Sequence, residues 1–167
     1  MRVERIPDER VGVLIGEDGE TVEELKELTN TEIEVDEGEI NVEGEDPMEE
    51  IRAQRIVKAI GRGFSPEKAF RLLEDNSDIA IIDVTDYEET KNGKERIKGR
   101  VIGRDGEAKE HIENETDTEI SVYGKTVSIL GEVKNVHIAK KAVEKLLEGR
   151  SHGTAYQVID KNRQKLI

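Results

Sequence analysis

Apolar positions along the chain follow two periods, and the order in which these periods occur is found twice. Alternation with a period of two predicts two strand pairs, whose apolar residues are Ile33, Val35, Ile40 and Val42, then Ile120, Val122, Val127 and Ile129. Helical spacing predicts amphipathic helices over residues 48–60 and 136–147, and places Val22, Leu25 and Leu28 on one stripe of another helix. Further strand candidates lie at 2–6 and 79–84. Each half therefore predicts the order strand, helix, turn, helix, strand, strand, helix.

The two halves are also related residue by residue. Residues 10–45 align without a gap on residues 97–132, at an offset of 87. Identical pairs include Ile15/Ile102, Gly16/Gly103, Asp18/Asp105, Gly19/Gly106, Thr29/Thr116 and Gly44/Gly131. A repeat of this length indicates two copies of one structural unit.

Charge separates the two copies. The net charge of −13 is concentrated in residues 1–75, which hold 10 Lys/Arg against 22 Asp/Glu, a balance of −12. Residues 76–167 hold 16 against 17, a balance of −1, and include basic stretches at 91–104 and 134–165. Because nucleic-acid affinity depends largely on neutralising phosphates, an anionic ligand is compatible only with the second half.

Composition excludes several classes of protein. With no Cys, the chain has no disulfide framework or thiolate metal site, which suits a reducing cytoplasm. No apolar run reaches the roughly 20 residues that span a bilayer, and the charged N-terminus does not resemble a signal peptide. Three histidines lack ligand spacing, and no carboxylate pair has an apolar pocket signal around it. We therefore expect a cytoplasmic protein that is not an enzyme, with no metal and no cofactor.

The motif Ile-Gly-x-x-Gly between two helices, present at 15–19 and 102–106, resembles the RNA-binding loop of the KH domain. The resemblance implies an α+β fold of two tandem type I (eukaryotic-type) KH domains, each βααββα with a three-stranded sheet packed on helices. The first domain would cover 1–75 with a linker helix capped by Ser65, with Pro66 at its first position. The second would cover 76–167 with a basic C-terminal tail.

Three further stretches narrow the resemblance. Residues 61–73, 121–131 and 151–167 are similar to the archaeal two-KH ribosome-assembly family, counterpart of the eukaryotic partner-of-Nob-one proteins. This implies binding near the 3′ end of small-subunit ribosomal RNA, and contact with a processing endonuclease or the alpha subunit of translation initiation factor two. The tail residues Lys161, Arg163 and Lys165 are compatible with mobile surface and with RNA contact alike.

The second copy carries the features that an RNA clamp needs. Glycines let a phosphate approach the main chain, and the N-terminus of the following helix favours an anion. The resemblance places the groove walls on apolar residues and the reading of base edges on the strand backbone. The predicted RNA-binding residues are Lys98, Arg100, Val101, Ile102, Gly103, Arg104, Asp105, Gly106, Lys109, Ile120 and Val122.

The first copy has the same loop with the opposite charge. Its loop and following helix carry Glu17, Asp18, Glu20, Glu23 and Glu24, which would repel phosphate and are predicted to dock a protein instead. Asp18 and Asp105 each precede a helix, where helix capping is the expected role. The alternative to RNA binding is an adaptor whose two KH folds contact only proteins.

Overall fold

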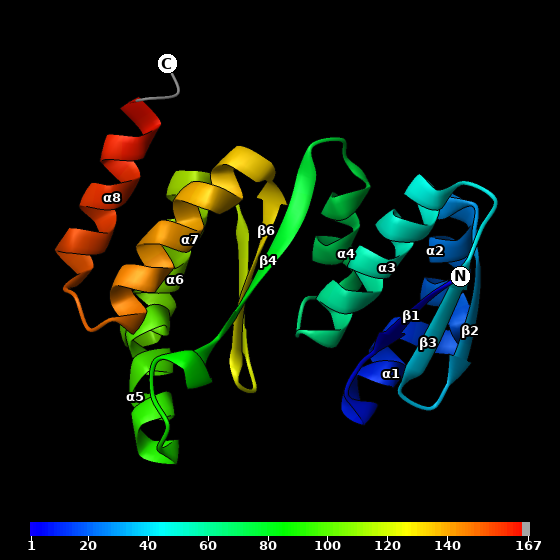
Figure 1. Ribbon diagram of the computed structural model, residues 1–167, viewed down its shortest axis with the longest axis horizontal. Coiled ribbons are helices and arrows are strands. Elements are labelled where there is room, and N and C mark those ends of the chain that lie inside the picture. The colour runs from blue at the N-terminus through cyan, green and yellow to red at the C-terminus, as the bar shows by residue number, and fades with distance from the viewer. Residues whose placement is uncertain (165–167) are drawn as a thin grey trace. The chain divides into compact units, whose positions relative to one another are not determined.

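The computed structural model describes residues 1–164, and the chain divides into two compact units at Ser77/Asp78 (Figure 1). The division falls two residues beyond the boundary expected from the sequence. Within the described residues, no helix is both long and apolar enough to cross a membrane.

The first unit has the predicted order of elements. They are β1 (Arg2–Arg5), α1 (Asp8–Ile15), the 3-10 turn η1 (Glu17–Gly19), α2 (Glu20–Thr29), β2 (Glu32–Asp36), β3 (Glu39–Glu43) and α3 (Pro47–Gly61), then α4 (Pro66–Ala69) and η2 (Phe70–Leu73). The strands form an antiparallel sheet in the order β1-β3-β2. Helices α2 and α3 pack against this sheet, and α1 packs against both helices.

The second unit repeats this plan and adds a helix. Its elements are β4 (Ser77–Asp83), η3 (Val84–Asp86), α5 (Lys91–Ile102), η4 (Arg104–Gly106), α6 (Glu107–Thr116), β5 (Glu119–Tyr123), β6 (Thr126–Glu132), α7 (Val133–Leu147) and α8 (His152–Gln164). The sheet order is β4-β6-β5, so β5 is an edge strand. The prediction of an α+β fold with two three-stranded sheets is confirmed.

The predicted strand residues face the cores as alternation requires. Ile33, Ile40 and Val42 are buried in the first unit, and Ile120, Val127 and Ile129 in the second. The predicted helical stripe was wrong at one position, because Leu28 is 49% exposed and Thr29 is buried in its place. The Thr29 hydroxyl donates to the Leu25 carbonyl at 2.7 Å, so a threonine is satisfied inside the core.

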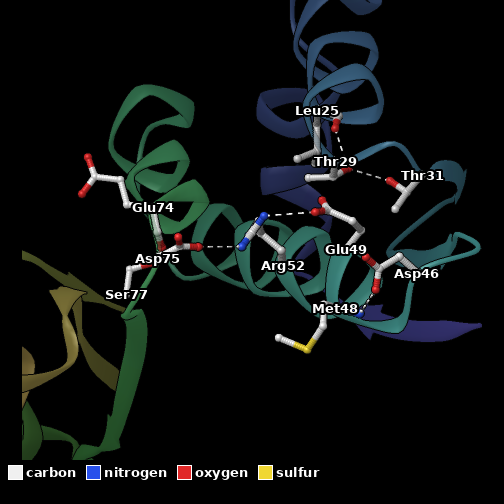
Figure 2. A network of polar contacts seen from close by, with 10 residues as sticks. All are labelled: Leu25, Thr29, Thr31, Asp46, Met48, Glu49, Arg52, Glu74, Asp75 and Ser77. Atoms are coloured by element: carbon white, nitrogen blue, oxygen red, sulfur yellow. Dashed lines mark hydrogen bonds and ion pairs between the residues drawn. The ribbon is translucent and has the colours of Figure 1, made fainter.

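The segment that closes the first unit is held to α3 by an arginine. Ser65 caps α4 by accepting from the Lys68 amide at 3.3 Å, as predicted. Arg52 on α3 then bridges Glu49 at 3.1 Å and Asp75 at 3.3 Å (Figure 2). The same view shows the Asp46 carboxylate at the start of α3, where it accepts from the Met48 amide.

The C-terminal tail is largely a packed helix, which the sequence pattern did not predict. Helix α8 lies against α6 and α7 on their side away from the sheet (Figure 1). Ala155 and Ile159 are buried there, and the Tyr156 ring contacts the His111 ring at a tilt of 43°, with ring centroids 4.0 Å apart. Of the tail cations, Arg163 pairs with Glu115 at 2.8 Å, while Lys165 lies outside the described residues.

Candidate nucleic-acid interface

The second Gly-x-x-Gly loop is a tight corner between α5 and α6. Gly103 has φ +76°, and a Cβ there would stand 2.7 Å from the Ala108 backbone nitrogen. Gly106 has φ +78°, but a Cβ there would meet nothing within 4 Å. Gly103 is therefore required by packing and by its φ, whereas Gly106 faces open space in front of the loop.

The N-terminus of α6 begins at this open space. Its N-cap is Gly106, which has no side chain with which to cap the helix. The prediction that Asp105 caps α6 was wrong, and so was the same prediction for Asp18 and α2. Asp105 instead adopts a left-handed φ of +54°, a conformation that aspartate tolerates better than most residues. Among the described residues no side chain caps α6, so its N-terminus, where the helix dipole favours an anion, is open to a ligand, although the Glu107 amide already donates to the Arg104 carbonyl.

The four predicted cations have different surroundings. Arg104 is exposed within the loop, and Lys109 pairs with Glu113 at 3.2 Å. Lys98 donates to the Gly124 carbonyl at 2.9 Å and pairs with Glu95 at 2.8 Å. The hydrogen bond and charge of Lys98 hold the pKa of the Glu95 carboxyl below its usual value.

Arg100 is turned toward the end of α7. Its guanidinium donates to the Leu146 carbonyl at 3.3 Å and to the Arg150 carbonyl. Carbonyl groups at a helix C-terminus interact favourably with a cation, because the helix dipole is negative there. Arg100 therefore anchors α5 to the end of α7, and its side chain is committed to the fold.

The predicted apolar residues divide into surface and core. Ile102 is 37% exposed beside the loop, and Val122 is partly buried on β5. Val101 and Ile120 were predicted to contact RNA, but their side chains are buried in the core. The side chains of Val101 and Ile120 can therefore only support the surface from within, although the main chain of Ile120 lies on the edge strand.

Glu113, which the sequence interpretation omitted, lies on α6 and contacts the edge strand β5. Its Oε2 accepts from the Ile120 amide at 2.8 Å, while its Oε1 faces Lys109. A signal was present in the repeat, because Lys109 and Glu113 replace Val22 and Lys26 of the first copy. The second copy therefore has an i, i+4 ion pair, which the first copy cannot form because one of its two equivalent residues is the apolar Val22.

The loop of the first unit has the same backbone. Gly16, Asp18 and Gly19 have φ values of +77°, +53° and +77°. The predicted docking residues Glu17, Asp18, Glu20, Glu23 and Glu24 are all exposed around it. Lys26 pairs with Glu23 at 3.0 Å. Because this is one cation among five carboxylates, the surface is strongly acidic.

Comparisons with known proteins place both units in one family. Residues 78–164 match the eukaryotic-type KH domain (KH-domain type I), and residues 1–74 match the KH domain. The chain is 42% identical to a KH domain-containing protein of Methanocaldococcus jannaschii, over 97% of this chain and 74% of that protein. It is 33% identical to the pre-rRNA-processing protein pno1 of Aspergillus fumigatus, over 63% of this chain and 43% of that protein.

Solved structures agree with the sequence relatives. Dim2p from Pyrococcus horikoshii superposes with a TM-score of 0.89 at 42% identity, covering 96% of this chain and 98% of that one. A complex of a/eIF2alpha, aDim2p and rRNA from the same organism matches with a TM-score of 0.90 at 41% identity, covering 98% and 94%. With two matched domains and these relatives, the chain belongs to the type I KH-domain family.

Proposed function

We propose that the second unit binds single-stranded RNA by clamping its backbone at Gly103–Gly106 and reading its bases along β5. A phosphate would lie at the uncapped N-terminus of α6, beside Arg104 and in front of Gly106, where no side chain hinders its approach. Bases would rest on Ile102 and Val122. The observation that carries this proposal is an exposed arginine inside a glycine corner, at the start of a helix whose N-cap is a glycine with no side chain to cap it.

The RNA we propose is small-subunit ribosomal RNA near its 3′ end, which the chain would bind as a non-catalytic assembly factor. Relatives named as pre-rRNA-processing proteins support this, as does the rRNA in the complex that contains aDim2p. The chain spans about two fifths of the length of the pno1 protein. The role therefore rests on the KH domains that the two proteins share.

The first unit, we propose, docks a protein, and the favoured partner is the alpha subunit of translation initiation factor two. Five exposed carboxylates surround its loop, which would repel RNA and attract a basic protein surface. The complex of aDim2p with a/eIF2alpha supports this partner over a processing endonuclease.

Arg104→Glu tests the RNA clamp, since it gives the second loop the sequence of the first. Loss of one cation and gain of one anion beside a phosphate should weaken binding by about ten- to a hundredfold, or about 1–3 kcal/mol. Fluorescence anisotropy with a labelled single-stranded RNA of mixed sequence measures this at about 0.15 M salt. The melting temperature should not change, because Arg104 is surface.

Lys140→Glu is the matched control, because it makes the same charge change at an exposed position of α7. Screening over about 8 Å at this ionic strength should limit its effect to about threefold or less. Equal dissociation constants for Arg104→Glu and the unchanged protein would refute the clamp at this loop, whereas no measurable RNA binding by the unchanged protein would leave the adaptor as the function.

A further inference from the structure

Glu113 connects two parts of the proposed RNA site that otherwise act separately. Lys109, in the first turn of α6, lies 3.2 Å from one carboxylate oxygen, and the Ile120 amide of β5 donates to the other at 2.8 Å. The Glu113 side chain is only 14% exposed and that of Lys109 28%, so both contacts are partly buried. One carboxylate thus holds a cation near the phosphate clamp and a main-chain donor on the edge strand.

The Ile120 amide belongs to the open edge of the sheet. In an antiparallel pair, the N–H and C=O of one residue both point either toward the partner strand or away from it. Ile120 lies opposite Ile129, yet its amide is bound by a side chain from α6, so its main-chain groups point outward. Val122, two residues along, has the same orientation. These are the groups that an unpaired base could contact.

We infer that Glu113 is a specificity gate, which occupies the Ile120 donor until a phosphate binds Lys109. A phosphate beside Lys109 competes for its ammonium group and repels the carboxylate. Two unit charges at about 4 Å interact by roughly 1 kcal/mol in water and more strongly where water is excluded. Glu113 then leaves the edge strand, and the Ile120 amide can donate to an acceptor atom of a base. This inference rests on the proposed RNA function.

Of the two copies, only the second unit has the two residues that form the gate. At the positions equivalent to Lys109 and Glu113, the first unit has Val22 and Lys26. Lys26 carries no acceptor and pairs with Glu23 instead, while Val22 is buried. The device therefore occurs in the copy whose loop carries an arginine, as expected if it serves RNA binding.

Glu113→Ala removes the gate, and Glu110→Ala is its matched control. Both variants remove one carboxylate from α6. Glu110 lies close to Glu113 on this helix, but its side chain is exposed. The probes are oligo(A), oligo(C) and oligo(U) octanucleotides and an abasic ribose-phosphate octamer, titrated into the full chain by anisotropy at about 0.15 M salt.

The gate predicts that Glu113→Ala tightens binding of the best base-bearing octamer by about three- to tenfold, the worth of one freed hydrogen bond. Glu110→Ala should tighten it by about twofold at most. The abasic octamer should gain less from Glu113→Ala than the base-bearing octamer does, because its phosphates can use the released Lys109 but it has no acceptor for the Ile120 amide.

A second readout needs no RNA. Hydrogen exchange at the Ile120 amide should be faster in Glu113→Ala than in the unchanged protein, and unaffected in Glu110→Ala. Weaker binding by Glu113→Ala would overturn the gate, because it would mean that the carboxylate itself contacts a base. A gain no larger than that of Glu110→Ala would also overturn it. Failure of the unchanged protein to bind any octamer would instead overturn the proposed RNA function, and the gate with it.

Discussion

The two Gly-x-x-Gly loops have one backbone conformation and opposite charge. The φ values of Gly16 and Gly103 differ by about a degree, and so do those of Asp18 and Asp105. Glu17 and Arg104 occupy the same place in this corner, and both are exposed. Since the shape is constant, the comparison separates what the fold requires of the loop from what a ligand requires of it.

The fold accounts for the first glycine in both loops. A Cβ on Gly16 would stand 2.9 Å from the Thr21 backbone nitrogen, just as a Cβ on Gly103 would press on Ala108. The second glycines, Gly19 and Gly106, face open space. The fold alone accounts for the first glycine of the acidic loop as well, so Gly-x-x-Gly by itself does not indicate RNA binding.

Alanine substitution at the first glycines should have the largest effect on stability. Gly16→Ala and Gly103→Ala combine a left-handed φ with a close backbone contact, and each should cost its own unit about 2–4 kcal/mol. Gly106→Ala, the control, meets only the cost of its φ, about 1 kcal/mol. Native-state hydrogen exchange reports the two units separately. If Gly16→Ala were tolerated and Gly103→Ala were not, the two corners would not be equivalent.

A smaller loss should follow Arg100→Ala. Because its guanidinium holds the end of α7, we expect the second unit to lose about 1–2 kcal/mol, the worth of charge-assisted bonds that remain partly in water. Arg96→Ala, which breaks an exposed ion pair with Glu88, should cost under about 0.5 kcal/mol. Urea unfolding of the full chain measures both.

The same variant distinguishes a structural cation from an RNA contact. The slope of log affinity against log salt should be unchanged in Arg100→Ala, because no phosphate contact is lost. A slope reduced by about one would instead show that Arg100 neutralises a phosphate, as the sequence alone suggested.

The repeat explains which features could be predicted. Two copies of one pattern determined the order of the elements and the position of both loops, since local periodicity decides which face of a strand or helix is buried. Leu28 was predicted to be buried because it continues the helical spacing of Val22 and Leu25. Thr29 is buried instead, and its hydroxyl can bond to the Leu25 carbonyl in the preceding turn.

Features that depend on contacts distant in the sequence could not be predicted. Arg100 meets α7 across 46 residues, and α8 is stabilised by burial of Ala155 and Ile159, which short-range patterns do not reveal. Asp105 was predicted to cap α6 because an aspartate just before a helix is typical of an N-cap. The left-handed conformation of the corner instead places Gly106 at the N-cap. The Glu113 contact likewise needs β5 beside α6.

Neutralising the first loop should have the smallest effect on RNA. Glu20→Gln, Glu23→Gln and Glu24→Gln together remove three exposed negative charges from α2 without creating a basic surface that would itself attract RNA. Affinity for single-stranded RNA should change by about threefold at most, since the second loop and its cations are unchanged and salt weakens the effect of exposed charges. Binding of the purified initiation-factor alpha subunit, measured by calorimetry, should be lost or weakened by at least about tenfold. Unchanged affinity for this subunit would refute the docking surface, while a large gain in RNA affinity would mean that the acidic loop restrains RNA binding by the whole chain.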